Sequence, residues 1–189
     1  MSKQVEMRFA GSGGQGVILA SVILAEAAVI CGLHTVQSQA YGPEARGGVS
    51  KAETILSHDR IWFSKVQAPD FLLALTQASL QAYTKDLKSD AVVMMDDSLA
   101  LPEGLDASRV IAIPILRTAR ETVGKAFTAN IVAVGAINAA LRLFPDEQLT
   151  EAVERHIPAG TEEINRKALE AGAALIADEV AARFGGRLG

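Results

Sequence analysis

The chain has 189 residues, 49% of them hydrophobic and 21% charged, which is the composition of a folded globular domain and not of a disordered segment. Its formal net charge of −4 argues against a general nucleic-acid-binding protein, because no excess of basic side chains is present to neutralise phosphates. The single cysteine excludes an internal disulfide and any iron–sulfur cluster held by several thiolates of this chain, and the 3 histidines lack the close spacing of a metal site.

Two strands and a helix are expected at the start of the chain. Residues 5–10 predict the first strand, 17–30 an apolar helix that ends before Gly32, and 34–39 the second strand. If the two strands are parallel neighbours, the loops that follow them emerge at the same carboxyl edge of one sheet, where ligands and partners of open α/β sheets bind. Cys31, directly after the helix, is interpreted as a small core residue.

The next segment predicts a different kind of pairing. Residues 49–56 alternate loosely between polar and apolar, residues 57–60 resemble a turn, and the apolar residues 61–63 follow as the expected second strand. This pattern is typical of an antiparallel hairpin inserted into a parallel sheet. Trp62 and Phe63 lie on the expected hairpin, where core packing is favoured over contact with a partner subunit.

The rest of the chain predicts buried strands followed by helices. Strands are expected at 70–75, 91–96 and 109–113, with a helix at 77–87 between the first two. Further helices are expected at 116–123, 129–143, 146–155 and 162–184. The fold class is therefore α/β: a three-layer Rossmann-like domain with a mixed, mostly parallel sheet, an inserted β-hairpin and a helical C-terminal third.

One domain, residues 1–184, is expected, followed by a flexible tail at 185–189. The N-terminus is too polar for a signal peptide, and no apolar run approaches the roughly 20 residues that cross a bilayer. The sequence therefore predicts a soluble, cytoplasmic protein with no membrane contact.

Some polar residues lie at strand ends or on apolar helices. Asp96 and Asp97 follow a buried strand and resemble a metal-binding pair, although acids at strand ends more often cap helices or face solvent. Asn130 and Asn138 lie on a mostly apolar helix, so one of them is expected to serve buried hydrogen bonding.

A glycine-rich loop follows the first strand and precedes the first helix. Its residues are Gly11, Ser12, Gly13, Gly14, Gln15 and Gly16. The spacing satisfies G-x-G-x-x-G, in which backbone N–H groups at a helix N-terminus surround an anion. Gln15 favours contact with a phosphate or a partner backbone, because its polar side chain stands among these donors.

Three other interpretations of this loop compete. A dinucleotide site needs an acid at the end of the second strand, where Ser38, Gln39 and Ala40 stand. A phosphate-binding P-loop needs Lys and then Ser or Thr after Gly16, where Val17 follows instead. The structural alternative is that the glycines only permit a tight turn and close helix packing.

The second loop follows the second strand and is built differently. Its residues are Tyr41, Gly42, Pro43, Glu44, Ala45, Arg46, Gly47 and Gly48. The Arg46 guanidinium could hold a carboxylate or phosphate through two hydrogen bonds, or it could pair with Glu44 and stiffen the loop. Pro43 rigidifies the turn, and the two final glycines allow close approach of a ligand or a neighbouring chain. Tyr41 is expected at a subunit interface rather than against an adenine ring.

Together the two loops resemble the gamma subunit of 2-oxoacid:ferredoxin oxidoreductases, most closely the 2-oxoglutarate and branched-chain branch. The Tyr-Gly-Pro-Glu-x-Arg-Gly-Gly string is long and unusual, which makes this resemblance specific; the pyruvate and indolepyruvate branches carry different second loops. The resemblance extends from about Met7 to Ile176 and includes Asn130-Ile131-Val132-Ala133-Val134-Gly135 and Glu163-Ile164-Asn165-Arg166-Lys167-Ala168-Leu169-Glu170-Ala171-Gly172.

The resemblance implies a non-redox subunit of a large enzyme. That enzyme converts a 2-oxoacid, coenzyme A and oxidised ferredoxin into an acyl-CoA, carbon dioxide and reduced ferredoxin. Thiamine diphosphate, magnesium and iron–sulfur clusters are implied on partner subunits, namely alpha and beta subunits and in some complexes a ferredoxin-like delta subunit. This chain is expected to bind none of these cofactors alone, to be inactive alone, and to form a homodimer when isolated.

The resemblance also implies a role for the two loops, which are expected to receive coenzyme A or to contact partner subunits. No catalytic residue is assigned to this chain. 2-Oxoglutarate is the first choice of substrate. A stand-alone dinucleotide-binding protein, and gamma subunits of branched-chain, pyruvate or indolepyruvate enzymes, are the alternatives.

Overall fold

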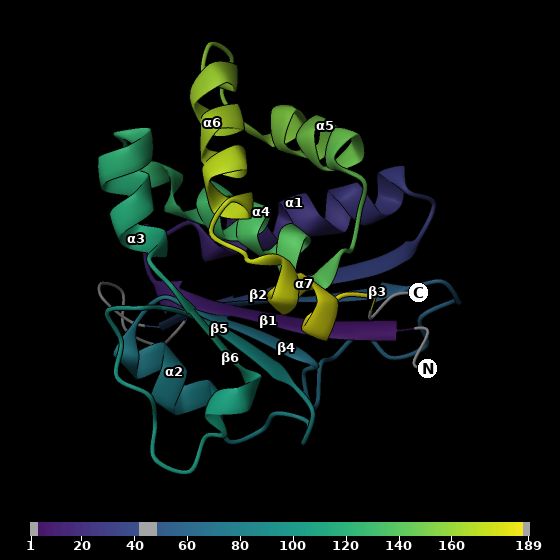
Figure 1. Ribbon diagram of the computed structural model, residues 1–189. Coiled ribbons are helices and arrows are strands. Elements are labelled where there is room, and N and C mark those ends of the chain that lie inside the picture. Colours follow the sequence, from purple (N-terminus) through teal and green to yellow (C-terminus); the bar gives the residue numbers. More distant parts are fainter. Residues whose placement is uncertain (1–3, 42–48, 187–189) are drawn as a thin grey trace.

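The computed structural model describes residues 4–41 and 49–186 and shows a six-stranded mixed sheet between layers of helices (Figure 1). The strand order is β2-β3-β1-β4-β5-β6. The strands are β1 (Gln4–Ser12), β2 (His34–Tyr41), β3 (Val49–Ser57), β4 (Phe71–Ala74), β5 (Val92–Asp96) and β6 (Val110–Ile113). The α-helices are α1 (Val17–Ile30), α2 (Gln77–Tyr83), α3 (Ile115–Arg117), α4 (Ala129–Leu141), α5 (Asp146–His156), α6 (Glu162–Ala173) and α7 (Asp178–Phe184).

Strand β1 lies inside the sheet, and its neighbours differ in direction. It pairs in parallel with β4 and antiparallel with β3, which in turn pairs antiparallel with β2. The first two strands are therefore not neighbours, because β3 lies between them. Since both are antiparallel to β3, they still run in the same direction. Gly11 and Tyr41 both stand opposite Ser50, so both strands end at the same edge.

The inserted antiparallel pair consists of β2 and β3, not of residues 49–56 with 61–63. After Ser57 the chain forms no further strand before β4, and Trp62 and Phe63 are 77% and 81% exposed. The expected core position of these two aromatic side chains is also wrong. Alternation along 49–57 correctly indicates a strand, but it carries no information about which strand pairs with it.

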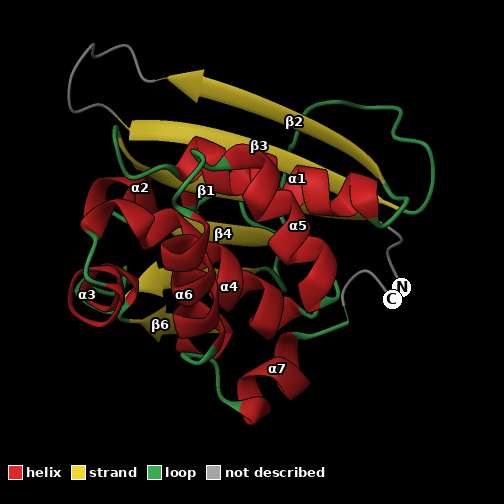
Figure 2. Ribbon diagram, turned by 90° about the horizontal axis from the view of Figure 1, so that it is seen from above, coloured by secondary structure: helices red, strands yellow, loops and turns green. Residues whose placement is uncertain are grey.

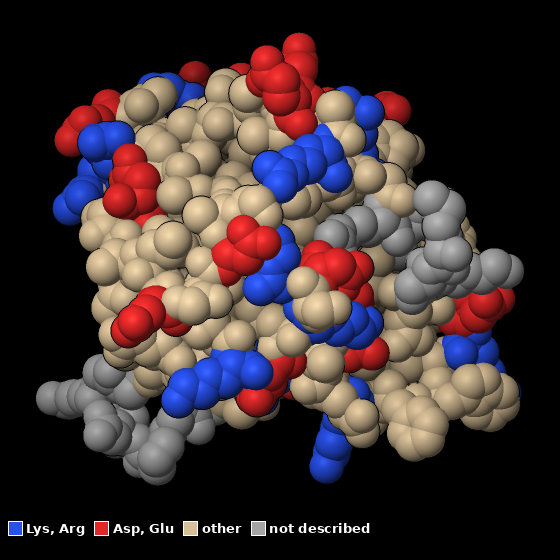
Figure 3. All heavy atoms as spheres, turned by 60° about the horizontal axis from the view of Figure 1, so that its bottom comes forward, with Lys and Arg blue, Asp and Glu red and all other residues tan. Residues whose placement is uncertain are grey.

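Helices cover the two faces of the sheet unequally. Helices α1, α4, α5, α6 and α7 lie on one face, and α2 lies on the other (Figures 1 and 2). The larger hydrophobic core lies under the five helices, and a smaller cluster around Leu72, Leu80 and Met95 lies under α2. On the α2 side, charged side chains of both signs are interspersed over the surface (Figure 3). No helix within the described residues is long and apolar enough to cross a membrane.

Helix α4 is buried almost all round, and α6 crosses it at very short range. All residues of α4 except Ala139 are buried. A Cβ atom added to Gly135 would lie 2.1 Å from the Leu169 carbonyl oxygen, and one added to Gly172 would lie 2.0 Å from the Val132 carbonyl oxygen. The two glycines therefore allow backbone-to-backbone contact between the helices.

The C-terminal third is helical as expected, but its last long helix is broken. The expected helix at 162–184 is two helices, α6 and α7, separated by residues 174–177. Backbone N–H groups of Leu175 and Ile176 donate to carbonyls three residues earlier, which tightens the last turn of α6 and lets both side chains pack against the core. The expected helix at 116–123 is the short α3 followed by a π-helical turn, Thr118–Val123.

Cys31 lies directly after α1 and is exposed, so its expected core position is wrong. Partial burial of the thiol nevertheless raises its pKa above the usual value, because desolvation disfavours the thiolate. The expected hydrogen-bonding role of an asparagine on α4 is confirmed at Asn138, whose side-chain amide donates to the Phe144 carbonyl and accepts from the Phe144 N–H, both at 3.0 Å.

The substitutions Gly135→Ala and Gly172→Ala should each destabilise the fold by about 3 kcal/mol, because a methyl group cannot fit against a carbonyl oxygen of the facing helix. The gain of about 1 kcal/mol in helix propensity is too small to compensate. Urea unfolding followed by circular dichroism measures the change. Gly13→Ala is the control, since nothing lies within 4 Å of its added Cβ; equal stability of all three variants would contradict close α4–α6 packing.

Candidate functional site

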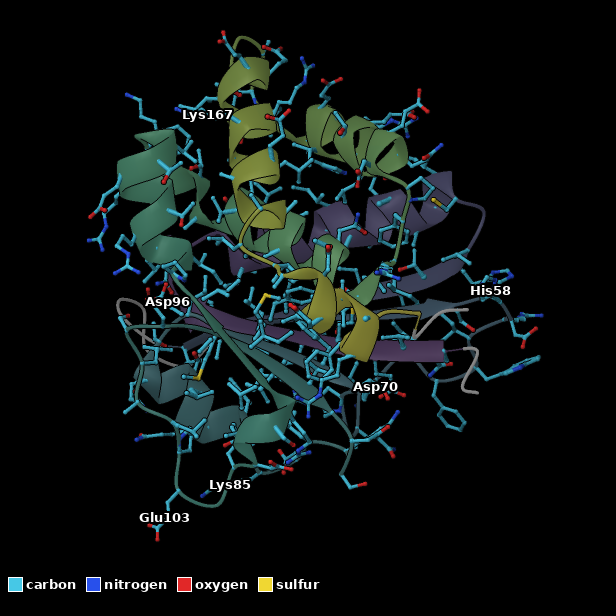
Figure 4. The ribbon with its side chains drawn as sticks, viewed as in Figure 1. His58, Asp70, Lys85, Asp96, Glu103 and Lys167 are labelled. Atoms are coloured by element: carbon cyan, nitrogen blue, oxygen red, sulfur yellow. The ribbon has the colours of Figure 1, made fainter. Side chains whose placement is uncertain are left out.

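The candidate site lies at the edge of the sheet where the parallel strands end. The first glycine-rich loop follows β1 there, the second loop follows β2, and Asp96 ends β5 at the same edge. Figure 4 shows Asp96 at this end of the sheet and Asp70 and His58 toward the opposite end. The structure therefore brings the starting points of both loops to one edge, as the sequence predicted.

The side chain of Gln15 joins the first loop to the end of β4. Its Oε1 accepts a hydrogen bond from the Ser12 N–H at 2.7 Å, and its Nε2 donates to the Leu75 carbonyl at 3.3 Å. Both ends of the amide are thus used by the protein itself. The structure shows that the amide fixes the loop on the sheet, and its predicted contact with a phosphate or a partner stays a prediction.

The glycines of this loop fall into two pairs. Gly11 and Gly16 are required for packing: a Cβ on Gly11 would lie 2.6 Å from Gln15 Oε1, and one on Gly16 would lie 2.7 Å from the amide nitrogen of Asn130. Gly16 also has a φ of +70°, a conformation that favours glycine. In contrast, Gly13 and Gly14 are exposed, and nothing lies within 4 Å of a Cβ added to either.

Asn130 lies behind the loop and was not assigned to the site from the sequence. It is the second residue of α4, is 4% exposed, and packs against Gly16 at the start of α1. Its Oδ1 is buried without a hydrogen-bond partner. The first turns of α1 and α4 therefore meet beside the glycine-rich loop. The sequence signal was an asparagine at the start of an otherwise apolar helix.

Asp96 and Asp97 form structural contacts at the same edge. The buried Asp96 carboxylate accepts the Leu116 N–H at 2.8 Å and the Ser98 N–H at 3.1 Å, and it also binds the Ser98 hydroxyl. Asp97 forms an ion pair with Arg117 at 2.9 Å. The two acids thus hold the start of α3 against the end of β5, which agrees with the capping interpretation rather than the metal pair.

A buried ion pair lies on the α2 side of the sheet. Arg8 on β1 donates from Nε to Glu53 on β3 at 2.8 Å, and the two residues are 4% and 8% exposed. Lys51 also binds Glu53, at 3.1 Å, while the Arg8 guanidinium lies 5.3 Å from the ring centre of Tyr83. The Nη1 atom of Arg8 is buried without a partner. Sequence reasoning missed this cluster because its members come from three separate elements.

The second loop lies outside the residues that the structure describes, apart from its first residue. Tyr41 is the last residue of β2. The candidate residues beyond the described part are Gly42, Pro43, Glu44, Arg46, Gly47 and Gly48. The roles predicted for them, including the Arg46 contact with an anion, stay predictions.

The metal ion and the iron–sulfur cluster implied by the resemblance find no ligand set among the described residues of this chain. Among the described residues, no group of three or more His, Cys, Asp or Glu side chains could hold a metal ion. One cysteine in the whole sequence cannot supply the several thiolates of an iron–sulfur cluster.

Comparison with known proteins gives one consistent result. Residues 6–175 match the family model described as pyruvate ferredoxin/flavodoxin oxidoreductase. The chain is 42% identical over 178 residues to the 2-oxoglutarate synthase subunit KorC of Methanothermobacter marburgensis, covering 90% of this chain and 96% of that protein. It is 38% identical to the ketoisovalerate oxidoreductase subunit VorA of Methanothermobacter thermautotrophicus, with 90% of this chain but 36% of that longer protein covered.

A solved structure agrees with the sequence matches. The keto/oxoacid ferredoxin oxidoreductase gamma subunit from Geobacter sulfurreducens PCA superposes with a TM-score of 0.82 at 43% identity, covering 91% of this chain and 95% of that one. These similarities confirm the resemblance drawn from the two loops, and they confirm the α/β fold with its mixed sheet.

Gln15→Glu should destabilise the protein by about 1 kcal/mol. The carboxylate can still accept from Ser12, but it cannot donate to Leu75 and places an oxygen beside that carbonyl, which costs about 1–3 kcal/mol. The favourable interaction of the new negative charge with the helix N-terminus contributes at most about 1 kcal/mol, so the loss is larger than the gain. Thermal unfolding measures the difference, with Gln67→Glu at an exposed position as control. Unchanged stability of the Gln15 variant would show that the amide does not hold the loop.

Proposed function

Because the chain belongs to the pyruvate ferredoxin/flavodoxin oxidoreductase family, we propose that it is the gamma subunit of a 2-oxoglutarate:ferredoxin oxidoreductase. The supporting observation is the similarity to 2-oxoglutarate synthase subunits along nearly the whole length of both chains. The complex would convert 2-oxoglutarate, coenzyme A and oxidised ferredoxin into an acyl-CoA, carbon dioxide and reduced ferredoxin.

The redox chemistry of this complex belongs to its other subunits. Alpha and beta subunits would hold thiamine diphosphate, magnesium and the iron–sulfur clusters, and a ferredoxin-like delta subunit would complete some assemblies. Ferredoxin would accept the electrons, and the complex would work in the cytoplasm. The single-cysteine sequence, with no metal-binding group among the described residues, supports this division of labour.

We propose that this chain receives coenzyme A at its two loops. Gly13 and Gly14 support the proposal, because they are the part of the first loop that packing does not require and that solvent can reach. They stand beside the start of the 14-residue helix α1, where the helix dipole favours a phosphate group. Arg46, on the second loop, would supply the charged partner of a phosphate. The net charge of −4 does not favour an anion, so any attraction is local.

A branched-chain 2-oxoacid is the second candidate substrate, and one observation favours it. The ketoisovalerate oxidoreductase subunits match 90% of this chain at 35–38% identity. Substrate contacts on partner subunits would separate the two enzymes, so the choice requires an assay of the complex.

The isolated chain should be colourless and should reduce no ferredoxin with any 2-oxoacid. Co-expression with alpha and beta subunits of the same kind of complex should restore coenzyme A-dependent reduction of ferredoxin, measured by absorbance. The rate should be higher with 2-oxoglutarate than with 2-oxoisovalerate. An isolated chain that carries an iron–sulfur cluster, or that binds NAD, NADP or FAD with micromolar affinity, would contradict the proposal. Faster turnover of 2-oxoisovalerate than of 2-oxoglutarate would show that the substrate is a branched-chain 2-oxoacid.

Two substitutions test the coenzyme A role in the assembled complex. Gly13→Asp places a negative charge in the exposed part of the first loop, and Arg46→Ala removes a cation from the second. Each should raise the apparent KM for coenzyme A by about tenfold, the effect of losing or opposing one charge-assisted hydrogen bond, while the KM for the 2-oxoacid stays constant.

Gly13→Asn is the matched control, since it has the size of aspartate without the charge. It should leave the KM for coenzyme A within about twofold of the wild-type value, because the position has open space. If Asp and Asn have equal effects, or if the complex dissociates in both loop variants, the loops contact partner subunits and do not bind coenzyme A.

A further inference from the structure

Strand β2 forms one edge of the sheet, and its outer side has no strand against it. It spans His34–Tyr41, a length of 8 residues, and pairs with β3 along its whole length. Within the described residues, no other strand or connection forms a backbone hydrogen bond with it. Alternate residues of an edge strand direct their N–H and C=O groups outward, so β2 offers a row of free donors and acceptors.

The two edges of this sheet differ in ways that matter for association. The opposite edge, β6, has 4 residues, follows Arg109 and ends before Pro114. Short length, a flanking charge and a proline are devices that keep an edge from pairing with another chain. Strand β2 is twice as long, and its sequence, HTVQSQAY, contains no Lys, Arg, Asp, Glu, Pro or Gly. It therefore lacks every sequence feature that normally protects an edge.

We propose that β2 pairs with β2 of a second copy of this chain, antiparallel across a twofold axis. A twofold axis places each strand opposite an identical strand, so a charge near the axis would lie close to the same charge on the other copy. The absence of Lys, Arg, Asp and Glu from β2 removes that repulsion. With the axis at Gln37, Val36 of each copy stands opposite Ser38 of the other, and the two sheets continue into one.

Two exposed aromatic side chains lie on the connection that follows β3, the strand paired with β2. The connection that carries Trp62 and Phe63 begins at Ser57, which stands directly opposite His34, the first residue of β2. The Arg60 guanidinium lies 4.6 Å from the Trp62 ring centre, which orders that side chain at the surface. Pairing of two strands alone is marginally stable in water, and aromatic side chains next to the strands supply apolar contact area for association.

Ser38→Lys tests the pairing in the full-length chain. Ser38 is exposed, and the diagonal distance between the two copies at this position is about 7–8 Å, so two lysines would repel each other across the axis. Sedimentation equilibrium should show a dimer for the wild-type chain and a dissociation constant raised about tenfold or more for the variant. Ala112→Lys, at an exposed position on the β6 edge, is the matched control and should leave the dissociation constant unchanged.

Hydrogen exchange provides the second measurement and requires no mutation. Amides in 34–41 should become more protected as the concentration of the chain rises, while those in 110–113 should not change. A chain that stays monomeric at about 100 μM, or a dimer that Ser38→Lys leaves intact, would overturn the proposal. Protection of 34–41 that arises only when a different subunit is added would also overturn it, because the occupant of the edge would then be that subunit.

Discussion

The close contact between α4 and α6 is the constraint on which the helical side of this protein depends. A helix apolar on all sides is stable only when neighbours cover every side, and α4 obtains that cover from α1, α6 and α7. Gly135 and Gly172 let α6 approach to backbone contact, with no room for a methyl group at either position. The same helix begins with Asn130 against Gly16, so the packing of the core reaches directly to the first glycine-rich loop.

Local patterns in the sequence were sufficient to identify most strands and helices, but not to pair them. Strands β4 and β5 are apolar runs bounded by turns, and each lies within a residue or two of its expected position. The pairing of β3 with both β1 and β2 depends on contacts between distant residues, and alternation within 49–57 cannot specify it. The break between α6 and α7 has the same cause, because the chain turns at 174–177 to keep Leu175 and Ile176 on the core.

The candidate site was located by its glycines, whereas their separate roles required the three-dimensional structure. G-x-G-x-x-G in a strand–loop–helix context gave the position of the loop, and the second loop gave the family. Gly11 and Gly16 pack against Gln15, Leu75 and Asn130, whereas Gly13 and Gly14 stay open, and Asn130 lies 114 positions beyond Gly16 along the chain. The physical distinction is between a glycine whose position leaves no room for a side chain beside a neighbouring residue and a glycine whose Cα faces only solvent.

The interior position of β1 has a consequence for the order in which this protein can fold during synthesis. The strand leaves the ribosome before its two neighbours, β3 and β4, and before α4, which belongs to the same hydrophobic core; these elements end at Ser57, Ala74 and Leu141. Until then the apolar side chains of Met7, Phe9 and Leu24 have no complete core to enter. The nascent chain thus carries an unburied apolar surface until α4 has been made, which makes it a substrate for chaperones that bind such segments.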